Sequence, residues 1–273
     1  MPKQLLRRLI AIVKRPLAIF KSQKRIRKDG QEAARQDYDE RISGLYEKKD
    51  YLDAYSDHTD LRVEEDPHEA IGGMWEEIGT LQYEFLLKKG LKPSHTLLDI
   101  GCGTLRAGRY FIKYLNPGGY TGLDISSKAI QYAKELVVTE GLTDKRPSLL
   151  HNPGKNLKFD DFHGEKFDYL LAHSVFTHLK PEHITECFEY AKRLMKPDSK
   201  FFFTFKEASR FSETGLKGFA YPFAFFAELA ERFGYNLINV SHEYLHPKGQ
   251  RMVLLSKQKI SPGNMGDSSA GMA

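Results

Sequence analysis

Short apolar runs alternate, from about residue 96 onward, with longer segments in which apolar residues recur every three or four positions. The short runs predict strands and the longer segments predict helices, because side chains alternate across a strand but return to one helix face about every 3.6 residues. Strands are expected at Thr96–Ile100, Tyr120–Asp124, Ser148–His151, Phe167–Ala172, Phe201–Phe205, Tyr235–Val240 and Arg251–Leu255. Helices are expected at Lys128–Glu140, Pro181–Met195 and Pro222–Phe233.

This alternation predicts an α/β protein. Five strands interleaved with helices imply a doubly wound, mostly parallel sheet. The last two strands are joined by the turn-like sequence HPKGQ, which predicts an antiparallel hairpin at one edge of the sheet.

Composition divides the chain into four expected regions. Residues 1–30 are basic and amphipathic, and residues 31–73 form a polar, partly helical extension with a helix around Glu32–Lys49. The main domain is expected to span residues 74–257 and to begin with an amphipathic helix that ends at Gly90. Residues 258–273 are small and polar, which predicts a disordered tail.

The positive charge is concentrated at the amino terminus. Residues 1–28 hold ten lysines and arginines and no acid, so subtracting them from the net charge of +5 leaves −5 for residues 29–273. A domain that follows nucleic-acid phosphates needs a basic face of its own, so nucleic acid is not expected as a partner. The two cysteines, Cys102 and Cys187, give no disulfide framework and fit a reducing cytosol. No apolar run reaches the roughly 18 residues of a membrane span, and no secretory signal is expected.

The sequence TLLDIGCGTLRAGRYFI, from Thr96 to Ile112, predicts a strand, a tight glycine turn and a helix. Glycines at the carboxyl end of a strand let a ligand approach the backbone. A dinucleotide site would have a third glycine where this chain has Arg106, which disfavours a nicotinamide oxidoreductase. Asp124 ends the next strand, 21 residues after Gly103, close to the spacing of about 20 at which an acid reaches a ribose. Asp124 taken alone could equally cap the following helix.

Four segments in order, LLDIGCGT, YTGLDIS, FDYLLAHSVFTHL and AKRLMKPDSKFFFTF, resemble the successive motifs of class I S-adenosylmethionine-dependent methyltransferases. The resemblance covers about residues 75–257. It implies a Rossmann-like, doubly wound sheet of seven strands with an antiparallel last strand, here preceded by an N-terminal helical extension. It also implies S-adenosyl-L-methionine as cofactor, and no metal is expected.

The resemblance also implies roles for individual residues. Asp99, Gly101, Cys102 and Gly103 would surround the methionine end of the cofactor, and Asp124 would hold the ribose. The remaining cofactor residues would be Ile125, Asn152, His173 and Ser174. Asn152 stands near the place where many members have an aspartate, and Arg106 is unusual in the loop. Arg106 could pair with Asp99, with an acid of the N-terminal helix, or with the methionine carboxylate.

Methyl transfer from a sulfonium demands mainly proximity and orientation, and a base is needed only when the acceptor keeps its proton. His178, just after the fourth strand, is the candidate base or acceptor contact, while a packing or capping role is the alternative. Tyr221, His246 and Gln250 flank loops at one edge of the sheet and are the candidates for substrate contact.

The first thirty residues have the pattern of an interfacial helix. At about 100° per residue, the apolar residues between Leu5 and Phe20 fall on one half of a helix and the basic residues on the other. This predicts binding to an anionic membrane surface and a peripheral, cytoplasmic location. A helix docked on the protein's own body, a partner-binding segment and a transit peptide remain open, although abundant lysine and scarce serine disfavour the last.

The sequence therefore predicts a methyltransferase acting on a small-molecule, glycan or lipid-linked acceptor at a membrane surface. The alternative is a non-catalytic binding module that keeps the cofactor fold and is recruited to a membrane or a partner. The glycine turn and Asp124 together disfavour this alternative, because a non-catalytic protein need not keep both.

Overall fold

The computed structural model describes residues 35–257, and the chain divides into two compact units, Met1–Asp50 and Tyr51–Ala273. In the first unit, residues 35–48 are helical, in agreement with the helix expected there. The predictions for residues 1–30 and 258–273 lie outside the described residues. Within residues 35–257, none of the helices combines the length and apolar character that crossing a membrane requires.

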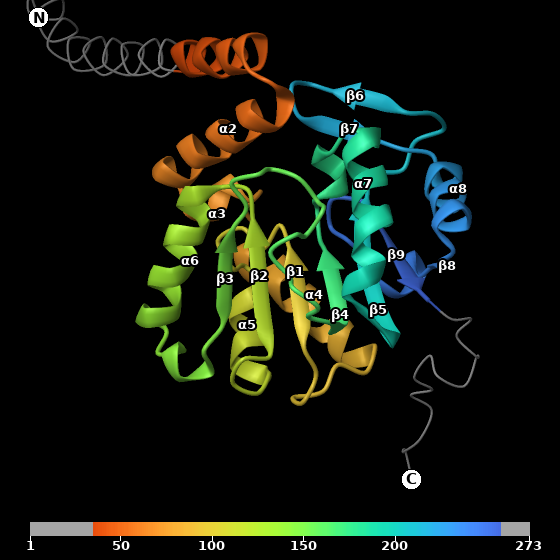
Figure 1. The fold of residues 1–273 in the computed structure, drawn as a ribbon. Coiled ribbons are helices and arrows are strands. Elements are labelled where there is room, and N and C mark those ends of the chain that lie inside the picture. Colours follow the sequence, from red (N-terminus) through yellow and green to blue (C-terminus); the bar gives the residue numbers. More distant parts are fainter. Residues whose placement is uncertain (1–34, 258–273) are drawn as a thin grey trace, which may run out of the picture. The chain divides into compact units, whose positions relative to one another are not determined.

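The second unit is built on a seven-stranded sheet in the order β3-β2-β1-β4-β5-β9-β8 (Figure 1). The strands are β1 (Leu97–Ile100), β2 (Tyr120–Asp124), β3 (Ser148–His151), β4 (Phe167–Ala172), β5 (Met195–Phe205), β8 (Asn236–Asn239) and β9 (Arg251–Ser256). β9 runs antiparallel to both β5 and β8, and the other neighbouring pairs are parallel. The predicted Rossmann-like fold, with its antiparallel last strand, is confirmed.

Helices cover both faces of the sheet. They are α2 (Tyr51–Glu65), α3 (Pro67–Ala70), α4 (Trp75–Lys88), α5 (Gly108–Tyr114), α6 (Ser127–Thr139), α7 (Pro181–Ala191) and α8 (Phe223–Phe233). Short 3₁₀ turns occur at η1 (Thr143–Lys145), η2 (Phe176–His178), η3 (Lys192–Leu194) and η4 (Ser241–Glu243). In Figure 1, α7 lies in front of the sheet and α4 behind it.

The two faces carry separate hydrophobic cores because side chains alternate along each strand. Leu98 and Phe203 point to the face covered by α7 and α8, in a cluster that also holds Phe188 and Phe226. Neighbouring residues such as Phe202 point to the opposite face, which α4, α5 and α6 cover. Burial on both faces explains why the strands appear in the sequence as nearly continuous apolar runs.

Two parts of the domain were not predicted as regular structure. β6 (Ser212–Thr214) and β7 (Gly218–Ala220) form a separate antiparallel hairpin between β5 and α8. α2 and α3 lie within residues 31–73, which were expected to be a polar, partly helical extension, but no helix was assigned to these positions.

α2 belongs to the same compact unit as the sheet, although the main domain was expected to begin at residue 74. Hydrogen bonds hold it to the segment that follows β2. The Ser126 hydroxyl donates to the Asp60 carboxylate at 2.5 Å, and the Lys128 N–H donates to it at 3.2 Å. The Ser56 hydroxyl donates to the carbonyl of Ile125 at 3.0 Å. α2 thereby lies over the carboxyl ends of the strands (Figure 1).

Candidate active site

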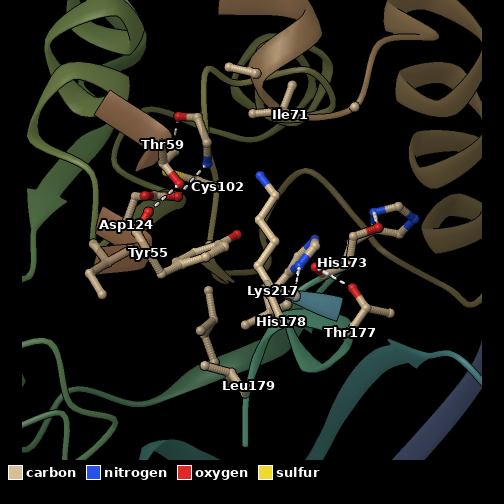
Figure 2. A pocket seen from close by; sticks show the side chains of 18 of the residues that line it. Tyr55, Thr59, Ile71, Cys102, Asp124, His173, Thr177, His178, Leu179 and Lys217 are labelled. Atoms are coloured by element: carbon tan, nitrogen blue, oxygen red, sulfur yellow. Dashed lines mark hydrogen bonds between the residues drawn. The ribbon is translucent and has the colours of Figure 1, made fainter. Parts of the chain in front are cut away.

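A cavity of about 590 Å³ lies at the carboxyl ends of β1, β2, β3 and β4. Its walls are completed by α2 and by the turn between β6 and β7. Figure 2 shows side chains from these elements pointing into the same space. The volume is within the range of small-molecule sites, and the position is the one where open α/β sheets bind ligands.

The glycine turn forms one wall of the cavity. Gly101 and Gly103 have φ angles of +72° and +54°, which side chains rarely adopt. A Cβ at Gly101 would also lie 2.5 Å from a methyl group of Val175. Only glycine therefore fits this turn, and its backbone is left open to a ligand.

Asp124 lies against this turn at the end of β2. It is only 8% exposed, and its two oxygens accept from the N–H groups of Gly103 and Ser126, each at 2.8 Å. Burial raises the pKa of the carboxyl, while the two backbone donors act against this rise. The N-cap of α6 is Ser126, whose hydroxyl accepts from the Ala129 N–H, so Asp124 is free of that capping role.

Asp99 and Arg106 lie near the same turn. Burial raises the pKa of Asp99 to about 7, and the Tyr120 hydroxyl donates to this carboxyl at 2.7 Å. Among the described residues Arg106 forms no ion pair with an acid, and its Nη1 donates to the carbonyls of Ile71 at 3.1 Å and Gly73 at 2.8 Å. It thereby fastens the segment between α3 and α4 to the glycine turn.

The residues expected at the adenine and at the end of β4 also line the cavity. Ile125, Asn152, His173 and Ser174 do so, together with Cys102, whose thiol pKa is raised by burial. The side-chain amide of Asn152 donates to the carbonyl of Asn156 at 2.6 Å, which fixes its orientation.

His173 and His246 are close neighbours in the buried part of the cavity, with ring centres 5.2 Å apart. His173 is hydrogen-bonded to the Tyr244 hydroxyl at 2.9 Å, and its pKa is lowered by burial. Nδ1 of His246 accepts a hydrogen bond from the backbone N–H of Lys248, so the neutral ring carries its proton on Nε2. This buried Nε2 has no hydrogen-bond partner among the described residues, which leaves a donor for a ligand.

Gln250, another predicted substrate residue, also lines the cavity but has a structural function there. Its amide is hydrogen-bonded to the hydroxyls of Ser174 and Thr204. Ser174 has a φ of +59°, a conformation that costs free energy for a residue with a side chain. Gln250 therefore helps to hold the turn after β4 in this shape.

Tyr221 does not line the cavity, and its prediction as a substrate residue is corrected here. Its side chain is fully buried in the core beneath α8, and its hydroxyl donates to the Leu179 carbonyl at 2.5 Å. The ring packs against Phe225 and Phe226, with centres 4.9 and 5.7 Å away. A ligand in the cavity has no access to it.

His178 lines the cavity in a defined tautomer. Its Nδ1–H donates to the Lys217 carbonyl at 2.6 Å, so Nε2 is left as the acceptor of the neutral ring. Burial, together with the nearby Lys217 ammonium, lowers the pKa of His178 to about 4 although the carbonyl opposes this shift. The ring stacks on Tyr55 with centres 5.4 Å apart.

Sequence reasoning missed the residues that face the cavity from α2 and from the β6–β7 turn. Tyr55, Thr59 and Arg62 come from α2, and Lys217 comes from the turn. The apolar residues of α2 do not gather on one helix face, so the sequence pattern did not indicate which side of this helix is buried. A lysine in a loop is usually exposed to solvent, so Lys217 also gave no signal. No group of His, Cys, Asp and Glu residues suited to a metal ion occurs within residues 35–257.

The strand order, the glycine turn after β1 and the buried acid after β2 together define the fold of class I methyltransferases. Residues 98–201 match the family model described as "Methyltransferase domain". This match agrees with the methyltransferase domain predicted from the sequence.

Solved structures show the same fold. One is magnesium protoporphyrin IX methyltransferase from Synechocystis PCC 6803 with bound SAH, at 16% identity and a TM-score of 0.57, covering 76% of this chain and 100% of that one. A SAM-dependent methyltransferase from Leishmania major is 14% identical with a TM-score of 0.60, covering 77% and 85%. Mitomycin 7-O-methyltransferase is 17% identical with a TM-score of 0.54, covering 81% and 67%. The family match and this fold agree with the predicted enzyme class and its cofactor, S-adenosylmethionine.

Proposed function

We propose that the cavity binds S-adenosylmethionine and that the protein transfers its methyl group to a small-molecule, glycan or lipid-linked acceptor. The observation that carries the proposal is the shared cavity. Asp124 and the glycine turn form one part of it, the cofactor part. α2, His178 and the β6–β7 turn form the other, the acceptor part. A nucleoside cofactor and an acceptor can therefore be held side by side, which is the main requirement of methyl transfer.

The residues of the first part fit this cofactor. Asp124 keeps lone pairs for the ribose hydroxyls while its two backbone contacts hold it in place. Ile125 and Asn152 border the space expected for the adenine, and Asp99 borders the space expected for the methionine amino group. The unpartnered Nε2–H of His246 is a ready donor for the methionine carboxylate. When bound, the cofactor supplies an electrophilic methyl group on a sulfonium.

His178 is proposed to act on the acceptor. Its free Nε2 can accept a proton from an acceptor hydroxyl or amine, and the Lys217 carbonyl keeps Nδ1 protonated throughout. The Tyr55 ring restricts the orientation of the imidazole. The magnesium protoporphyrin IX and mitomycin enzymes, which share this fold, support a small-molecule acceptor as the first choice.

Transfer of isotopically labelled methyl groups tests this function. The full chain is incubated with S-adenosylmethionine labelled in the methyl group and with a cell extract, and methylated products are identified by mass spectrometry. We expect labelled products together with S-adenosylhomocysteine. Binding of S-adenosylhomocysteine without any labelled product would favour the non-catalytic module, and binding of NADH in its place would remove the assignment.

The location at a membrane remains a proposal that rests on the pattern of residues 1–30. A cytoplasmic enzyme held at an anionic surface by this segment would meet a lipid-linked acceptor at the same surface. We expect the full chain to co-sediment with anionic liposomes and salt to weaken the binding. A protein that starts at Gln31 should remain soluble and still bind cofactor. Equal sedimentation of both proteins would contradict the membrane proposal.

A further inference from the structure

The cationic side chains in the acceptor part of the cavity are not used by the function proposed above. Lys217 and Arg62 both line the cavity, one from the β6–β7 turn and one from α2, and both are partly buried. In Figure 2 the Lys217 side chain extends into the cavity beside Tyr55 and His178.

No carboxylate within residues 35–257 forms an ion pair with Lys217 or Arg62. Arg62 helps to lower the pKa of Asp66, but this acid is exposed and does not line the cavity. Arg62 donates to the backbone carbonyl of Glu69 at 3.1 Å. The Lys217 ammonium lies 5.8 Å from the centre of the Tyr55 ring, a contact that leaves its charge uncompensated.

The acids that line the cavity do not form ion pairs with Lys217 or Arg62, and each has a different position or hydrogen-bond partner. Asp99 and Asp124 belong to the cofactor part. Glu186 accepts the Leu157 N–H at 2.7 Å, and the Glu69 carboxylate lies against Gly73. Glu186 keeps its negative charge when it accepts this hydrogen bond, so the charges of Lys217 and Arg62 together still exceed it in the acceptor part.

Two partly buried like charges are unfavourable unless a ligand supplies the opposite charge. Burial and the nearby Arg62 lower the pKa of Lys217 to about 8, so most of its side chains are still charged at pH 7. Burial lowers the pKa of His58 on α2, and the same two cations add to this shift, which shows that they act on one region. An anion bound between them would relieve this repulsion.

We infer that the acceptor carries an oxyanion, a carboxylate or a phosphate, which the side chains of Lys217 and Arg62 bind beside His178. Lys217 then has two functions at once, because its carbonyl fixes the His178 tautomer while its ammonium anchors the acceptor. The group to be methylated would lie on the remainder of the acceptor, within reach of Nε2 of His178. This inference rests on the proposed function and specifies its substrate class.

The test measures binding of small probes to the full protein saturated with S-adenosylhomocysteine, so that the cofactor part of the cavity is filled. The probes are phenyl phosphate and benzoate, with phenol and benzyl alcohol as neutral analogues, followed by ligand-observed NMR titration. We expect at least one anion to bind at least tenfold more tightly than its neutral analogue, and higher salt to weaken this preference. The comparison of phosphate with carboxylate shows which oxyanion the site prefers.

Variants locate the binding site of these probes. Lys217→Met keeps the length of the side chain and should abolish the preference for anions, while Lys217→Arg should retain it. Lys113→Met removes an exposed lysine of α5 and should change nothing. Melting temperatures show whether each variant is folded.

The inference is overturned if no anion binds, if neutral analogues bind as tightly, or if Lys217→Met keeps the preference. A separate titration with S-adenosylhomocysteine distinguishes failure of the oxyanion site from failure of the cofactor site. Wild-type protein that fails to bind S-adenosylhomocysteine contradicts the proposed function itself. Cofactor binding without a preference for anions contradicts only the oxyanion site.

Discussion

His178→Ala is expected to lower turnover by about 10² to 10⁴ while the affinity for S-adenosylmethionine stays nearly unchanged. The variant removes the Nε2 acceptor that faces the cavity, and no atom of the cofactor part changes. Turnover is measured with a saturating acceptor, and cofactor affinity is measured by calorimetry.

Two further variants separate a catalytic function of His178 from a purely structural one. His178→Gln can still donate to the Lys217 carbonyl but offers no comparable base, so it should be as inactive as the alanine variant and melt closer to wild type. His163→Ala removes an exposed histidine and should have full activity. Normal turnover in His178→Ala together with a lowered melting temperature would assign His178 a purely structural function.

The pH dependence gives an independent signature of the same residue. Because the pKa of folded His178 is about 4, the base form is present throughout the range from pH 6 to 8, and no loss of rate in that range should come from this group. The unfolded chain, with a pKa of about 6.5, binds more protons than the folded chain between pH 6.5 and 4. This residue therefore stabilises the fold above pH 6.5, and that contribution is lost as the pH falls toward 4. The melting temperature of His178→Gln should fall less between pH 7 and pH 5 than that of the wild type.

Asp124→Ala is expected to weaken binding of S-adenosylmethionine and S-adenosylhomocysteine by about 1.5–3 kcal/mol, roughly tenfold to more than a hundredfold. The substitution removes the acceptor proposed for the ribose. It also frees the N–H groups of Gly103 and Ser126, which define the shape of the turn. Calorimetric titration of both ligands measures the effect.

Asp124→Asn provides the matched comparison, since its single amide oxygen cannot replace both carboxylate oxygens. Its affinity should fall as well, with a smaller loss of stability than in the alanine variant. Asp144→Ala removes an exposed acid of η1 and is the control for a general change of charge. If Asp124→Ala binds both ligands as tightly as wild type, the ribose is held elsewhere.

The sequence by itself determined the sheet and the cofactor side of the cavity. β2, β3 and β4 have the predicted bounds because buried strands depend on a local and continuous apolar pattern. Gly101 and Gly103 were recognisable for a local reason too, since their positive φ angles exclude most side chains. Asp124 was found from its spacing because parallel strands end at the same edge of a sheet.

Only the tertiary structure determined which residues form the acceptor part of the cavity. α2 carries no apolar stripe, and its buried residues include Ser56 and His58, because it is held by hydrogen bonds to a polar site. Aromatic character alone could not show that Tyr221 faces the core.

The same is true of His178, whose tautomer is fixed by the carbonyl of Lys217, 39 residues away in the sequence. Local pattern encodes which element forms and which face is buried. The side chains that share the acceptor part of the cavity are brought together only when distant loops and helices pack against the sheet.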